Sequence, residues 1–102
     1  MDAQLLKNQA DHVANILKQM SNKYRLLILC ALAEQELSVT DLNSQILLSQ
    51  SALSQHLAKL RETKIVSTRR VSQTIYYRVA DPKIKALLKA LHDNYCQVDA
   101  VS

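Results

Sequence analysis

The sequence of 102 residues contains no glycine, no phenylalanine and no tryptophan, and its only proline is Pro82. Without glycine, the chain lacks the glycine-rich loops that cradle phosphate groups in nucleotide-binding proteins. Without phenylalanine and tryptophan, a core must be filled mainly by Leu, Ile, Val and Ala side chains. This composition predicts a small and mainly helical protein.

Long hydrophobic runs are also missing. The longest run is "LLILCALA", Leu26 to Ala33, which is too short to span a bilayer, and the N-terminus lacks the layout of a signal peptide. We therefore expect one cytoplasmic domain, residues 1–102, with no membrane partner. In that compartment structural disulfides are rare, so Cys30 and Cys96 are expected to be redox-active, metal-binding or simply buried.

Positive charge is concentrated in the middle of the chain. Residues 42–78 hold six basic residues and one acidic residue, a net charge of +5, whereas the whole chain carries +4. A local basic field of this kind suits a polyanion such as nucleic acid. A basic surface that contacts only solvent would give the same pattern.

Hydrophobic periodicity and capping residues predict five helices and one hairpin, in the order ααααββα. The predicted helices are 3–19, 23–34 (capped by Asn22), 39–45 (opened by a Ser38–Asp41 capping box), 50–62 (capped by Ser49) and 82–96 (opened by Asp81 and Pro82). Between the last two, "VSTRRV" and "TIYYRV" are rich in β-branched and aromatic residues. They predict a β-hairpin that turns at Ser72–Gln73.

The stretch "LSQSALSQHLAKLRETKIV", Leu48 to Val66, has an apolar stripe at helical spacing but an unusual opposite face. That face carries Ser51, Ser54, Gln55 and Ala58, with Lys59 beside it. No acidic residue occurs between Asp41 and Glu62. Since a carboxylate would repel phosphate, its absence favours a helix that faces DNA.

A short helix, an acid-free helix and a basic hairpin follow one another as in a winged helix-turn-helix, in which the second helix reads base edges in the major groove. Gln and Ser can pair with bases, while Lys and Arg contact phosphates. The candidate DNA-binding residues are Ser49, Gln50, Ser51, Ser54, Gln55, His56, Lys59, Arg69, Arg70 and Gln73. His56 lies at the edge of the apolar stripe, so a packing role is an equal alternative.

Three segments, "ELSVTDL", "LSQSALSQHLAKLRETKIV" and "QTIYYRV", resemble the ArsR/SmtB family of winged-helix repressors. The resemblance covers essentially the whole chain. It implies a homodimer built through helices 3–19 and 82–96, with residues 38–79 as helix-turn-helix and wing, that reads a palindromic operator. Leu47 and Ser72–Gln73 depart from the family, because many members have glycine at those places.

The family's metal sites are not preserved. Ser38 and Thr40 replace a cysteine pair, and hydroxyls are poor ligands for thiophilic metals. Along the last helix Asp81 matches a ligand, but Lys83, Asn94 and Gln97 replace the others. His12 and His92 remain, and isolated histidines more often pack or hydrogen-bond. We therefore expect no metal and no other cofactor.

The positions of Cys30 and Cys96 resemble the BigR/HlyU branch of the family, in which a cysteine pair responds to reactive sulfur. This resemblance implies low-molecular-weight persulfides or oxidants as the inducer and a bridge between the two cysteines. The residues around Cys30 favour a different reading, a small buried side chain, because Leu26, Leu27 and Ala33 surround it. Cys96 lies at a helix C-terminus, where the dipole disfavours a thiolate.

Two alternatives to a sulfur-controlled repressor remain. One is a constitutive regulator or an anti-silencer with unreactive cysteines, and the other is a winged-helix module that binds protein. An enzyme is not expected, because the sequence offers no set of nucleophile, base and acid.

Overall fold

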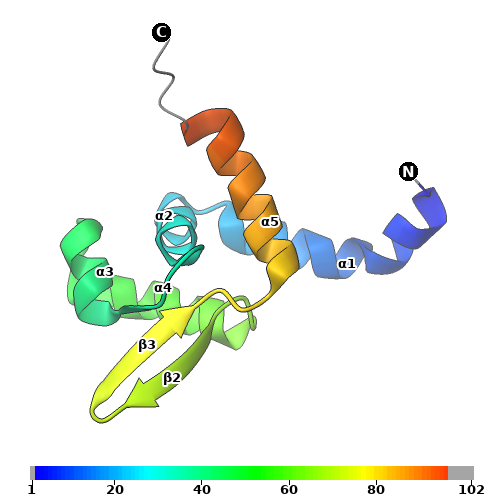
Figure 1. Ribbon diagram of the computed structural model, residues 1–102. Coiled ribbons are helices and arrows are strands. Elements are labelled where there is room, and N and C mark those ends of the chain that lie inside the picture. Colours follow the sequence, from blue (N-terminus) through cyan, green and yellow to red (C-terminus); the bar gives the residue numbers. More distant parts are fainter. Residues whose placement is uncertain (1, 97–102) are drawn as a thin grey trace, which may run out of the picture.

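The computed structural model describes residues 2–96 (Figure 1), so Gln97 and the side chain of Cys96 lie outside the described residues. Its helices are α1 (Ala3–Met20), α2 (Lys23–Leu32), α3 (Val39–Gln45), α4 (Gln50–Glu62) and α5 (Pro82–Leu91), followed by a π-helical turn, η1 (His92–Cys96). Its strands are β1 (Leu37–Ser38), β2 (Ser67–Val71) and β3 (Thr74–Arg78).

The predicted winged helix-turn-helix is confirmed, with one addition. Residues Leu37 and Ser38 form a short strand that pairs with Tyr77 and Tyr76 of β3, so the sheet has three antiparallel strands in the order β1-β3-β2. A strand of two residues is too short to produce the alternation that reveals strands in a sequence. The second helix ends at Leu32 rather than near residue 34.

The predicted capping residues are confirmed. Asn22, Ser38, Ser49 and Asp81 each accept a backbone N–H at the start of the following helix. The pair of bonds between Ser38 and Asp41 is reciprocal, because each side chain accepts from the other residue's backbone N–H at 3.1 and 3.0 Å. These local bonds explain why the helix starts were predictable from sequence.

Two turns use a left-handed backbone conformation without glycine. Lys64 has φ 64° just after α4, where the N–H groups of Lys64 and Ile65 donate to the carbonyls of Arg61 and Leu60, a Schellman arrangement. Ser72 has φ 58° at the wing tip. Of the two places where many family members have glycine, only the wing tip has a positive φ, at Ser72. Leu47, which precedes α4, has no positive φ and is 93% exposed.

The hydrophobic core lies where α2, α3, α4 and α5 meet the base of the wing. Its fully buried side chains are Ile28, Leu29, Leu32, Leu42, Leu53, Leu57, Leu60, Val79 and Leu88. Helix α1 contributes little, because Leu5, Leu6 and Leu17 are 65%, 47% and 50% exposed. In Figure 1 the N-terminal half of α1 projects away from the other helices.

Candidate nucleic-acid interface and cysteine site

Helix α4 presents the polar face that its sequence predicts. Its leucines are buried in the core, while Ser51, Ser54, Gln55, Ala58 and Lys59 are exposed on the other side. Ser49 and Gln50, at the start of the helix, are exposed as well. The helix therefore offers a continuous polar surface that carries no negative charge over its first twelve residues.

The wing adds positive charge next to this face. Arg61, Thr68, Arg69, Arg70 and Ile75 line a shallow hollow of about 300 Å³, and its lining contains no carboxylate. Arg61 was not among the predicted DNA-binding residues. It lies near the C-terminal end of α4 and lines this hollow together with the two wing arginines.

The two arginines of the wing differ in their surroundings. Arg69 Nε donates to both carboxylate oxygens of Glu36, at 2.7 and 2.9 Å, and its guanidinium carbon lies 5.3 Å from the centre of the Tyr76 ring. Arg70 is exposed, and within residues 2–96 its side chain makes no hydrogen bond or ion pair. Gln73, at the wing tip, is also exposed.

His56 packs against α2 instead of standing out on the polar face. It is half-buried, and its ring lies 6.2 Å from that of Tyr24. Desolvation, aided by the positive charge of Arg25, lowers the pKa of His56 below 6.5. Of the two roles predicted for this residue, the geometry favours packing.

Cys30 is exposed, so the reading of its neighbours as a buried environment was wrong. Helix α2 turns Ile28, Leu29 and Leu32 to the core and leaves Leu27 and Cys30 on its outer side. The run "LLILCALA" is apolar on both sides of the helix, so its sequence could not reveal which residues face inward.

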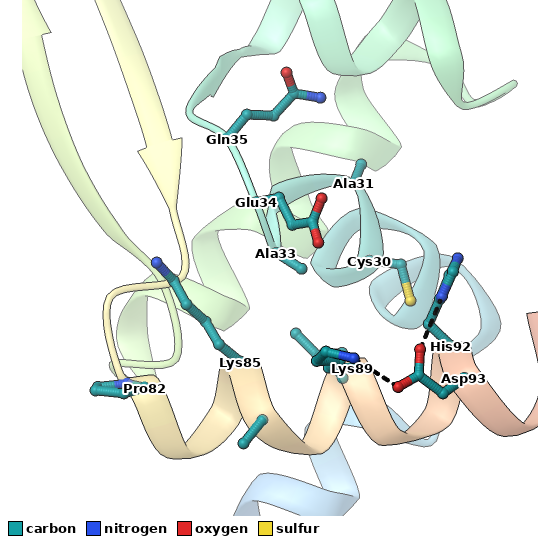
Figure 2. Close-up of a pocket in the computed structure, with 12 residues that line it drawn as sticks. Cys30, Ala31, Ala33, Glu34, Gln35, Pro82, Lys85, Lys89, His92 and Asp93 are labelled. Carbon is teal, nitrogen blue, oxygen red and sulfur yellow. Dashed lines mark hydrogen bonds and ion pairs between the residues drawn. The ribbon is translucent and has the colours of Figure 1, made fainter.

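Cys30 borders a hollow of about 660 Å³ between the end of α2 and the helices α5 and η1. The remaining lining residues are Ala31, Ala33, Glu34, Gln35, Pro82, Lys85, Ala86, Leu88, Lys89, His92 and Asp93. Figure 2 shows the sulfur of Cys30 directed towards the ring of His92. Cys30 therefore faces the turn that ends at Cys96.

Charged groups at this end of the hollow are paired. Lys89 Nζ lies 2.7 Å from one oxygen of Asp93, and His92 Nδ1 lies 3.6 Å from the other. The hydrogen bond from Lys89 lowers the pKa of Asp93, and the same bond raises the pKa of Lys89. Lys89 and Asp93 thus bring both signs of charge to the hollow that Cys30 borders.

The described part of the chain contains no group of three or more His, Cys, Asp and Glu residues that could hold a metal ion. Lys83 is exposed, and Asn94 uses its amide to donate to the carbonyl of Ala90 at 2.6 Å. None of the helices in residues 2–96 is long and apolar enough to cross a membrane.

A short helix, a second helix whose exposed face carries no acid over its first twelve residues, and a basic hairpin together define a winged helix-turn-helix DNA-binding protein. The family model described as "Bacterial regulatory protein, arsR family" matches residues 22–68. Similar curated proteins include the transcriptional activator HlyU of Vibrio cholerae, 50% identical over 91% of this chain and 85% of its own. The biofilm growth-associated repressor of Xylella fastidiosa is 43% identical over 89% of this chain and 80% of its own.

Solved structures agree with these sequence relationships. The repressor BigR from Xylella fastidiosa has a TM-score of 0.88 at 41% identity, covering 96% of this chain and 100% of that one. Reduced HlyU from Vibrio cholerae has a TM-score of 0.83 at 49% identity, covering 92% and 98%. The chain belongs to the arsR family of bacterial regulatory proteins. It is a transcriptional regulator, and its relatives are regulators and not enzymes.

Proposed function

We propose that this protein is a cytoplasmic, homodimeric repressor that binds a palindromic operator and releases it when Cys30 and Cys96 are bridged by reactive sulfur. Residues 38–79 form the DNA-binding unit in this proposal, and the segments 3–19 and 82–96 form the dimer contact. Two observations support it: the exposed, acid-free face of α4 and the exposure of Cys30 opposite η1.

On DNA, the N-terminal half of α4 would lie in the major groove. Ser54 and Gln55 would then reach base edges and set sequence preference. Lys59 at the flank of the helix and Arg70 on the wing would contact phosphates, and these contacts set register rather than sequence. The other residues predicted to contact DNA are Ser49, Gln50, Ser51, Gln73 and Arg69, of which Arg69 is also paired with Glu36. His56, packed against Tyr24 of α2, would support α4 from its inner side.

The proposed dimer would cover apolar surface that one chain leaves exposed. Leu5, Leu6 and Leu17 of α1 are about half exposed or more, and Tyr95 of η1 is 84% exposed. Removing apolar surface from water is the main favourable contribution to most protein association. Sedimentation equilibrium of Leu6→Glu and Leu17→Glu should show monomers where the parent chain forms dimers.

The proposed switch begins when a cysteine thiolate attacks the outer sulfur of a low-molecular-weight persulfide, which forms a protein persulfide and expels a thiolate. The second cysteine then attacks the inner sulfur of that persulfide. A disulfide forms and hydrosulfide leaves. If both cysteines carry an added sulfur, their condensation gives a trisulfide and releases hydrogen sulfide.

The bridge would join α2, which packs against the recognition helix, to the end of the proposed dimer helix. A constraint between them would alter the geometry of the two half-sites. The names of the relatives include both an activator and a repressor, so an anti-silencer that acts through the same DNA contacts is the second candidate.

Single cysteine variants test the switch. Reduced Cys30→Ser and Cys96→Ser should bind the operator as the parent chain does, and neither should release it on persulfide treatment, since capture needs both thiols. A double variant serves as the control for unspecific effects of the reagent. If either single variant releases DNA to the same extent as the parent chain, modification of one cysteine is sufficient and the bridge is not the switch.

A further inference from the structure

One ion pair reaches across the whole sheet. Arg69 of β2 lies opposite Tyr76 of β3, and Tyr76 pairs on its other side with Ser38 of β1. Glu36 precedes Ser38 by two residues, and Arg69 passes the Tyr76 ring to reach its carboxylate. The guanidinium is therefore held between an aromatic ring and a carboxylate in the segment that leads into the helix-turn-helix.

This ion pair fixes the direction in which the Arg69 side chain points. The Nε group of Arg69 donates to both carboxylate oxygens of Glu36, so the guanidinium is held towards β1. The Arg69 side chain is still 55% exposed and that of Glu36 is 29% exposed. An ion pair this open to solvent contributes little to stability, so its main effect is on the charge that the wing presents.

A phosphate group that approached Arg69 would have to compete with Glu36 and would also be repelled by it. Arg70, the next residue, has no such carboxylate within the described chain. The wing thus carries two adjacent arginines, of which Arg69 is paired with a carboxylate and Arg70 is not. Because the charge of Arg69 is partly neutralised by Glu36, Arg69 contributes less to the sequence-independent attraction for DNA, which depends on the number of phosphates that basic side chains neutralise.

We infer that Glu36 is a positioning residue that limits the electrostatic part of DNA binding by holding Arg69 away from the phosphates. This inference rests on the proposed placement of the wing on DNA. Of these two adjacent arginines, only Arg70 then makes a full phosphate contact, while Arg69 stays paired with Glu36. A carboxylate at position 36 thus weakens attachment to sequences other than the operator.

The variant Glu36→Gln tests the inference, since the amide has the same size but no charge. Binding to a scrambled duplex should strengthen about 5-fold per protomer at about 0.15 M salt, and the slope of log affinity against log salt should steepen by about 0.9 per protomer. Glu34→Gln is the matched control, because Glu34 is an exposed carboxylate nearby that does not pair with Arg69. It removes the same charge and should leave the slope much less changed. Thermal unfolding of both variants checks that the fold is retained.

Whether Glu36 affects DNA binding through its pairing with Arg69 is tested in an Arg69→Gln background. There, Glu36→Gln should have no further effect on affinity or slope. If its effect persists, the carboxylate acts by its own charge and the inference is overturned. An unchanged or weaker affinity of Glu36→Gln in the parent background also overturns it.

Arg70→Gln separates this inference from the proposed interface. If that variant weakens binding and flattens the salt slope while Glu36→Gln behaves like Glu34→Gln, the wing contacts DNA and only the inference fails. If Arg70→Gln leaves both quantities unchanged, the wing does not contact phosphates. The proposed interface then fails, and the inference fails with it.

Discussion

The imidazole of His56 lies 6.2 Å, centre to centre, from the phenol ring of Tyr24, and this contact joins the recognition helix α4 to α2. Cys30 lies on the same helix α2, on its outer side. The contact thus places a titratable group between the polar face of α4 and the helix that carries the exposed thiol.

His56 gives the folded protein a defined dependence on pH. Because desolvation and then Arg25 lower its pKa in the folded chain, the unfolded chain binds more protons between that value and 6.5. The free energy of unfolding should therefore fall on acidification through this window and be regained as pH rises towards 6.5 and above. Urea unfolding of the parent chain and of His56→Gln, measured over this range, should show a weaker dependence in the variant. His12→Gln, an exposed imidazole on α1, is the control, and an equal change in both variants would contradict this account.

Substitutions on the polar face of α4 should change the preference for the operator sequence without changing the sequence-independent electrostatic attraction for DNA. Gln55→Ala and Ser54→Ala should each weaken operator binding by about 1–3 kcal/mol and relax base preference, with little change in the salt slope. Operator and scrambled duplexes titrated at several salt concentrations measure both effects. Gln35→Ala, at an exposed position outside both the proposed DNA-binding unit and the proposed dimer contact, is the control. Unchanged operator affinity and specificity in Gln55→Ala would show that α4 is not the recognition helix.

Local signals made the helix-turn-helix predictable. Ser38 and Asp41 bond to each other, and Ser49 bonds within its own first turn, so the residues that start α3 and α4 are neighbours in sequence. The exposure of Cys30 was not predictable, because α2 is apolar on both sides and only tertiary packing selects the inner one. The bond between Glu36 and Arg69 joins residues 33 positions apart, and it depends on the register of a sheet whose first strand gave no sequence signal.

Glycine at the first central position of the wing tip should stabilise the protein. Ser72 has φ 58° while Gln73 has no positive φ, the pattern of signs in a type II′ turn, which favours glycine at its first central position. Ser72→Gly should raise the free energy of unfolding by about 0.5–1 kcal/mol, because it removes the steric cost of the left-handed conformation. Gln73→Gly, the neighbouring control, should lower it by a similar amount. Urea denaturation decides, and a loss of stability in Ser72→Gly would contradict the turn geometry.

Zinc or cadmium at modest excess should leave operator binding nearly unchanged. Lys83 replaces one ligand of the family's site on the last helix, and the amide of Asn94 already bonds to the backbone of its own helix. Calorimetry of the reduced protein, paired with operator titrations, tests this expectation. Tight, stoichiometric metal binding together with loss of the DNA complex would contradict it.

The central claim is that a sulfur bridge within one chain turns DNA binding off, and intact-mass analysis of the same sample used for operator titration tests it most directly. After persulfide treatment, the account predicts a monomeric chain under denaturing conditions that has lost the two thiol hydrogens, with or without added sulfur, and whose operator affinity is lower. Reduction should restore the original mass and the original affinity together. A bridged chain that still binds the operator as tightly as the reduced one would contradict the account, and so would a treated chain that loses DNA while both thiols remain.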